Sequence, residues 1–254
     1  MQENSMTLSK TLLAAVSVAS LAGAASAEPV RNVVLVHGAF ADGSGWKPVA
    51  EILQADGYTV SVVQQPMTSV ADDVAATNRI LDGQSGPAVL VGHSYGGAVI
   101  TEAGNHANVA SLVYVAAFAP AEGDVLGAMS EGTPPASHSI TATSDGFLLV
   151  DPAQFPADFA ADVPAATAEF MAISQIPMNG QIWGTPIGAP AWQYKPSFAV
   201  LTTSDRMINP DLQRSMYARA GSDVTEIDAS HSVFLSHPQD VADVIEAAAV
   251  AAGL

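Results

Sequence analysis

Three residues, Ser94, Asp205 and His231, could together turn an alcohol into a nucleophile. Ser94 is the middle residue of G-H-S-Y-G, between Gly92 and Gly96, and the acid and the histidine follow it along the chain. A serine hydroxyl is a weak nucleophile at neutral pH, so it needs a base, which an acid must orient. The order serine, acid, histidine is one in which such sets occur. The three residues therefore predict covalent catalysis at an acyl carbonyl.

The glycines beside Ser94 fit a tight turn from a strand into a helix. In such a turn a Cβ at Gly92 or Gly96 would collide with the neighbouring strand or helix. The turn lifts the serine hydroxyl out of the sheet, and the helix that begins near Tyr95 points free N–H groups at the atom under attack. The N–H of Tyr95 is therefore the first predicted donor to an oxyanion.

A second oxyanion donor is expected from the loop that follows the first strand, "HGAFADGSGW" at 37–46. Gly38 would let this backbone approach the site closely. The N–H of Ala39 would then face the developing negative charge together with that of Tyr95.

Other histidines and acids fit these roles less well. Asp205 ends the run "AVLTTSD" and His231 follows "EIDAS", so each falls at the carboxyl end of a predicted strand. Asp124 remains the alternative acid, because proteins of this architecture can place the acid one strand earlier, whereas Asp228 is expected to be buried in mid-strand. The remaining histidines are expected to make structural, loop, cap or helix-end contacts: His37, His93, His106, His138 and His237.

Short aliphatic runs alternate with alanine-rich stretches of helical spacing, which predicts an α/β fold. Strand, helix, strand, helix implies a mostly parallel sheet with helices on both faces. The first five strands are expected to be buried on both faces. The predicted strands are 31–38, 59–65, 88–94, 111–117, 197–205 and a final one at 224–230; helices are expected near residues 50, 75 and 100 and over 238–252.

Residues 121–195 break this alternation. They hold 8 of the 16 prolines, yet they also hold Phe147, Phe155, Phe159, Phe170, Trp183, Trp192 and Tyr194. A disordered linker would be poor in aromatic residues, so the segment is expected to fold as a cap inserted into a core of 28–120 and 196–254. Its aromatic side chains either pack on the sheet or line a substrate cavity.

Residues 1–27 are predicted to be a secretory signal peptide. Lys10 precedes the uncharged run "TLLAAVSVASLAGAA", and Ala25 and Ala27 fit a signal peptidase site. The run is short for a membrane span, so the mature chain is expected to be exported, to the periplasm or the medium, without a membrane anchor.

The composition limits the partners. Asp and Glu number 25 against 8 Lys and Arg, for a net charge of -17, which disfavours nucleic acid as a partner. The sequence has no cysteine, so thiolate chemistry, disulfides and cysteine-built metal sites are excluded. The predicted chemistry needs no cofactor and no metal.

Five segments resemble the α/β-hydrolase superfamily, and within it the branch that holds plant methyl-ester esterases, such as methyl salicylate esterase, and the hydroxynitrile lyases. They are "VLVHGAFADGSGW", "VLVGHSYGG", "VYVAAFAP", "TTSDRMI" and "DASHSVFLSHP". The resemblance spans most of the chain from residue 31 onward except 121–195. It implies an α/β-hydrolase fold with an inserted cap.

The same resemblance distinguishes lyase chemistry from ester hydrolysis. In the lyases of this branch a threonine follows the first-loop histidine and a lysine follows the catalytic histidine; here those positions hold Gly38 and Ser232. The resemblance therefore implies a serine hydrolase that cleaves carboxylic esters, and the apolar content of 121–195 indicates small to medium, fairly hydrophobic substrates. The alternatives are a cofactor-free haloperoxidase or perhydrolase with the same triad, and a non-catalytic ligand-binding protein on the same scaffold.

Overall fold

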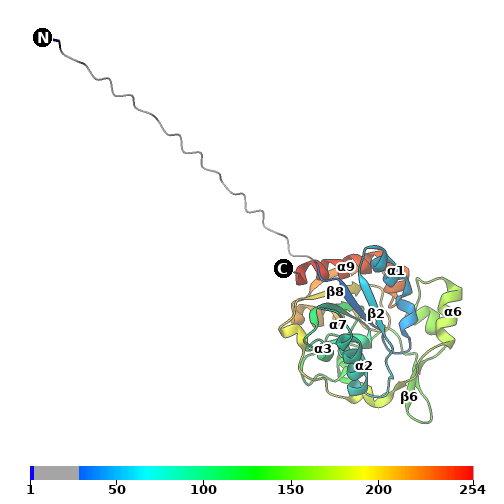
Figure 1. The fold of residues 1–254 in the computed structure, drawn as a ribbon. Coiled ribbons are helices and arrows are strands. Elements are labelled where there is room, and N and C mark those ends of the chain that lie inside the picture. The colour runs from blue at the N-terminus through cyan, green and yellow to red at the C-terminus, as the bar shows by residue number, and fades with distance from the viewer. Residues whose placement is uncertain (3–28, 254) are drawn as a thin grey trace.

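The computed structural model describes residues 1–2 and 29–253, and its core is a six-stranded parallel sheet between two layers of helices (Figure 1). The predicted signal peptide lies outside the described residues apart from its first two, so export stays a prediction. The sheet order is β2-β1-β3-β4-β8-β9. The strands are β1 (Asn32–Val36), β2 (Thr59–Val63), β3 (Ala88–His93), β4 (Val109–Val115), β8 (Ser197–Thr202) and β9 (Asp223–Ile227).

The inner strands are apolar on both sides because each side packs on a different helix layer. In β1, Val34 and Val36 join one buried cluster, whereas Val33 and Leu35 join the other. Successive strand residues point to opposite faces, so an uninterrupted aliphatic run suits a sheet covered on both sides. The prediction for the central strands is thus confirmed.

The helices form two layers. Helices α1 (Lys47–Ala55) and α9 (Pro238–Ala252) pack together on one face, and α2 (Val70–Asp82), α3 (Tyr95–Ala103) and α7 (Pro210–Ala220) lie on the other (Figure 1). Side-chain caps mark where some of them start: the Ser69 hydroxyl accepts from the N–H of Asp72 at 3.0 Å. The predicted closing helix over 238–252 is confirmed.

The edges of the sheet differ from the prediction. Edge strand β2 is only partly buried, with Val63 as its single buried residue, so burial of 59–65 on both faces was wrong. The other edge strand, β9, is largely exposed and ends at Ile227. Asp228 is therefore not buried in mid-strand: it is exposed just after β9, where it accepts from the Ser204 hydroxyl at 2.6 Å.

Residues 121–195 connect β4 to β8. Two elements of this segment, α6 and β6, lie at the margin of the fold, away from the central sheet (Figure 1). Phe155 and Phe159 are buried and stacked, with ring centroids 4.6 Å apart. The segment contains α4 (Leu126–Gly132), the antiparallel strands β5 (Ile140–Ala142), β6 (Phe147–Val150) and β7 (Met178–Asn179), α5 (Phe155–Phe159), α6 (Ala165–Ile173) and short 3-10 turns η2 (Gly180–Gly184) and η3 (Ala191–Gln193).

No helix in the described part of the chain is long and apolar enough to span a bilayer.

Candidate active site

Ser94 lies between β3 and α3 in a backbone conformation that L residues rarely adopt, with φ 53° and ψ -122°. The adjacent glycines make this turn possible. A Cβ on Gly92 would lie 2.5 Å from the carbonyl oxygen of Gly96, and one on Gly96 would lie 2.6 Å from that of His37. Ser94 thus sits at the carboxyl end of the sheet, where parallel α/β folds present their ligand sites.

Two backbone N–H groups beside Ser94 are free to donate. Within the described residues neither the N–H of Ala39 nor that of Tyr95 has an acceptor. A Cβ on Gly38 would lie 2.6 Å from the Cβ of Ser94, so this glycine lets the Ala39 loop come close. Ser94, Ala39 and Tyr95 line one small cavity, an arrangement suited to an oxyanion.

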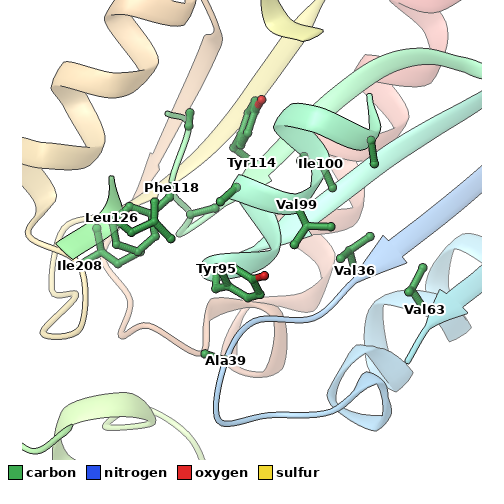
Figure 2. Packing of buried hydrophobic residues seen from close by; sticks show 14 of the residues in the cluster. Val36, Ala39, Val63, Tyr95, Val99, Ile100, Tyr114, Phe118, Leu126 and Ile208 are labelled. Atoms are coloured by element: carbon green, nitrogen blue, oxygen red, sulfur yellow. The ribbon is translucent and has the colours of Figure 1, made fainter. Parts of the chain in front are cut away.

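The side chain of Tyr95 anchors the start of α3. Its phenol donates to the buried carboxylate of Asp73 on α2 at 2.7 Å. Burial raises the pKa values of both groups, which keeps the phenol protonated as the donor. Figure 2 shows Tyr95 at the beginning of its helix, near Ala39 on the loop after β1. The sequence motif gives no sign of this anchor.

Asp205 and His231 meet in the structure. The Nδ1–H of His231 donates to Asp205 Oδ2 at 2.8 Å, and both side chains are buried. The other carboxylate oxygen, Oδ1, accepts from the N–H groups of Met207 and Ile208 at 2.8 and 3.0 Å. Such a carboxylate holds the imidazole in one orientation and one tautomer.

The far ring nitrogen of His231, Nε2, is available. Among the described residues it has no hydrogen-bond partner although it is buried, and Ser94 Oγ makes no hydrogen bond either. His231 and Ser94 line the same cavity. A base with a vacant acceptor nitrogen thus shares a cavity with the hydroxyl that it would deprotonate.

The other predicted candidates lie elsewhere. Asp124, the alternative acid, accepts from Arg219 at 2.7 Å and from the N–H of Ala121 at 2.8 Å. His37 is buried in the first loop, where its Nδ1–H donates to the Gly38 carbonyl at 2.9 Å. Of the two acids weighed, the structure therefore brings Asp205 to His231.

His93 holds the loop that carries His231. The two imidazole rings lie 4.6 Å apart, and the Nε2–H of His93 donates to the backbone carbonyl of His231 at 2.9 Å. Burial lowers the pKa of His93 well below its usual range, so this ring is neutral. A structural or loop contact was predicted for His93, which flanks the serine motif, and this bond to a residue 138 positions away is such a contact.

Residues of the segment 121–195 hold the same loop. The Asp162 carboxylate accepts from both the N–H and the hydroxyl of Ser230, and Ser232 donates to the Phe159 carbonyl at 2.9 Å. The Phe159 ring also meets the His231 ring edge-on at 4.7 Å. Both neighbours of His231 are thus tied to residues 159–162.

The buried neutral histidines predict a loss of stability in acid. Burial lowers the pKa values of both His37 and His93, whereas in the unfolded chain each has a pKa of about 6.5. As the pH falls through that value, the unfolded state takes up protons that the folded state does not. The free energy of unfolding should then fall by up to about 1.4 kcal/mol per pH unit for each histidine.

Urea denaturation at pH 7.5, 6.5 and 5.5 measures this dependence. His93→Gln should flatten the slope of unfolding free energy against pH by about one histidine's share, whereas His138→Gln, at an exposed cap position, should leave it unchanged. Equal slopes for the wild type and His93→Gln would show that His93 takes up a proton in the folded state.

The cavity that contains Ser94, here called the Ser94 cavity, is small and mostly apolar. Its volume is about 20 Å³, room for roughly one water molecule. Besides the residues already named, its lining includes Phe118 after β4, three residues of the segment 121–195 and two from the loop after β8: Ile140, Phe159, Trp183, Met207 and Ile208. Within the described residues, no three histidine or acidic side chains are arranged to hold a metal ion.

The sequence of this chain matches a known protein family. The family model described as "Alpha/beta hydrolase family" matches residues 33–244, and the chain belongs to that family. The predicted α/β-hydrolase fold is therefore confirmed.

Two relatives and one solved structure illustrate the similarity. A carbendazim-hydrolysing esterase of Nocardioides sp. (strain SG-4G) is 35% identical over 112 residues, which are 39% of this chain and 46% of that protein, less than half of its length. A pyrethroid hydrolase of Sphingobium wenxiniae is 26% identical over 247 residues, covering 85% of this chain and 86% of the relative. The crystal structure of a pyrethroid hydrolase from Sphingobium faniae JZ-2 matches with a TM-score of 0.75 at 24% identity, over 85% and 96% of the two chains; this likeness shows the fold alone.

Solved structures with this fold include a plant protein. A variant of tomato methylketone synthase I matches with a TM-score of 0.76 at 14% identity, covering 88% of this chain and 99% of that one. This match places a plant protein among those with the same fold. Membership of the plant esterase and lyase branch remains a prediction.

Proposed function

We propose that this protein is a cofactor-free serine esterase that works through an acyl-enzyme. The observation that carries the proposal is the contact between Asp205 and His231, with Nε2 of that histidine vacant in the cavity that holds Ser94. Both named relatives are hydrolytic enzymes, one called an esterase and one a pyrethroid hydrolase, which supports ester hydrolysis.

In the first half-reaction, Ser94 Oγ attacks the ester carbonyl carbon while His231 Nε2 takes its proton. The N–H groups of Ala39 and Tyr95 hold the resulting oxyanion. Collapse of the tetrahedral intermediate breaks the carbon–oxygen bond to the alcohol, which leaves with the proton from His231. Asp205 stabilises the imidazolium that exists between these two proton transfers.

In the second half-reaction, water replaces the alcohol. His231 takes a proton from the water as its oxygen attacks the acyl carbon, and then returns a proton to Ser94 Oγ as the carboxylic acid leaves. The apolar lining of the Ser94 cavity favours hydrophobic groups on the ester. Among the described side chains, only Ser94 and His231 need to gain or lose a proton, and Asp205 stays ionised.

Product analysis tests the proposal against its alternatives. With p-nitrophenyl butyrate the protein should release nitrophenol and butyric acid in equal amounts, and in acetate with hydrogen peroxide it should form peracid more slowly than it hydrolyses the ester. Faster peracid formation would favour a perhydrolase. No turnover of any ester by folded protein would favour a ligand-binding protein.

A further inference from the structure

A second hollow lies beside the Ser94 cavity. This flanking groove has a volume of about 160 Å³ and lies between the loop after β1, helix α6 and helix α8 (Val233–Ser236). Apolar side chains dominate its lining, and they include Phe40, Ala41, Phe170, Met171, Phe234 and Leu235. None of the proposed catalytic side chains faces it.

Phe40 is the shared wall of the two hollows. It lines both the Ser94 cavity and the flanking groove, and it directly follows the predicted oxyanion donor Ala39. Its backbone has φ 63°, a conformation that L residues rarely adopt, so the local fold holds this residue in place. Phe40 is the one described residue that the two linings have in common.

The Ser94 cavity is too small for an ester by itself. At about 20 Å³ it has room for about one water, whereas the flanking groove is eight times larger by the same measure, 160 against 20 Å³. The other hollow that adjoins the site, through Ile140 and Trp183, is larger, about 570 Å³, and is also mostly apolar, but it is more open to solvent and carries the ionisable side chains of Glu131 and His138 in its lining.

The rim of the flanking groove is apolar as well. On α6, Phe170 lines the groove and is 65% exposed, and Ile173, which follows three residues later, is 78% exposed. Large apolar side chains that gather beside an apolar hollow mark a site that an apolar ligand covers. The lining has one charged side chain, Asp42, which lies on the loop after β1; its other polar side chains are hydroxyls, from Ser44 on that loop and from Thr167 and Ser174 at α6.

We infer that the flanking groove binds a hydrocarbon arm of the ester substrate, with Phe40 as the wall that the arm must pass. This inference rests on the proposed function, because the arm is defined by an ester whose carbonyl lies at Ser94. Each methylene buried in the groove should raise kcat/KM about fourfold until the groove is filled. The substrate class is therefore an ester with at least one extended apolar arm.

Filling the groove tests the inference. Thr167 lines it from an exposed position on α6, so Thr167→Trp should block it without disturbing the core, and Glu169→Trp, exposed on the same helix and outside the groove lining, is the matched control. kcat/KM is measured for p-nitrophenyl acetate, butyrate, hexanoate and octanoate, and for acetates of ethanol, butanol, hexanol and octanol.

For the wild type and Glu169→Trp, kcat/KM should rise with chain length in one of the two series. A rise among the p-nitrophenyl esters means that the acyl arm enters the flanking groove, and a rise among the acetates means that the alcohol arm does. Thr167→Trp should lose at least about tenfold on the eight-carbon substrate, the gain from two or more methylenes, and keep its activity on the shortest one. Equal chain-length profiles in all three proteins, or an equal loss on every substrate, would overturn the inference. Absence of hydrolysis by the wild type would instead overturn the proposed function.

Discussion

Replacing Ser94 by alanine should lower kcat by about a millionfold on p-nitrophenyl butyrate, because the members of such a triad act as a unit. The substitution removes the attacking oxygen and leaves the strained turn, the oxyanion donors and the contact between Asp205 and His231 in place. KM should change little, since the Ser94 cavity keeps its apolar lining. Steady-state kinetics with a high enzyme concentration measures the residual rate.

A second serine serves as the control. Ser85 is exposed and precedes β3, at the opposite end of the strand from Ser94, so Ser85→Ala should retain wild-type kcat. If Ser94→Ala kept more than about a hundredth of the wild-type kcat, far above the loss seen when such a nucleophile is removed, another group would have to be the nucleophile.

Replacing Asp205 by asparagine should lower kcat by about ten-thousandfold, through the tautomer of His231. All groups around this carboxylate donate to it: two backbone N–H groups reach Oδ1, and the Thr202 hydroxyl, Gln213 Nε2 and His231 Nδ1 reach Oδ2. The backbone donors cannot reverse, so the asparagine oxygen would keep the Oδ1 position and its NH2 would face His231. The proton would then move to Nε2, which could no longer accept the proton of Ser94.

Asp124 provides the matched control for that substitution. It is the alternative acid, and it pairs with Arg219 in a partly exposed position. Asp124→Asn should lower kcat by less than about fivefold, since such an ion pair contributes at most about 1 kcal/mol. Equal losses from the two substitutions, with both variants folded by circular dichroism, would contradict the assignment of Asp205.

The position of the candidate site could be read from local patterns. The turn at Ser94 needs glycine on both sides for steric reasons, and those reasons act within a few residues. The ends of parallel strands share one edge of a sheet, so residues that follow β8 and β9 were expected near Ser94, and the structure brings Asp205 and His231 together there. Local steric rules and the topology of the sheet were therefore enough to predict that Ser94, Asp205 and His231 lie close together.

Contacts between distant segments could not be predicted in the same way. The bond from His93 to the His231 carbonyl and the pairing of Asp162 with Ser230 join positions 138 and 68 residues apart. The pairing with Asp162 depends on how the proline-rich segment folds, for which the sequence shows no clear periodicity. Hydrophobicity alone also failed to separate the edge strand β2 from the central ones, because an edge is defined by which neighbours are missing.

The most direct test of the account is whether Ser94 is an activated nucleophile. A fluorophosphonate probe reacts with a serine whose proton is taken by a neighbouring base, so intact-mass spectrometry followed by peptide mapping should show one adduct, on Ser94. The Ser94→Ala protein should stay unlabelled. Folded wild-type protein that gains no adduct, or gains it at another residue, would contradict the triad and with it the enzyme that it defines.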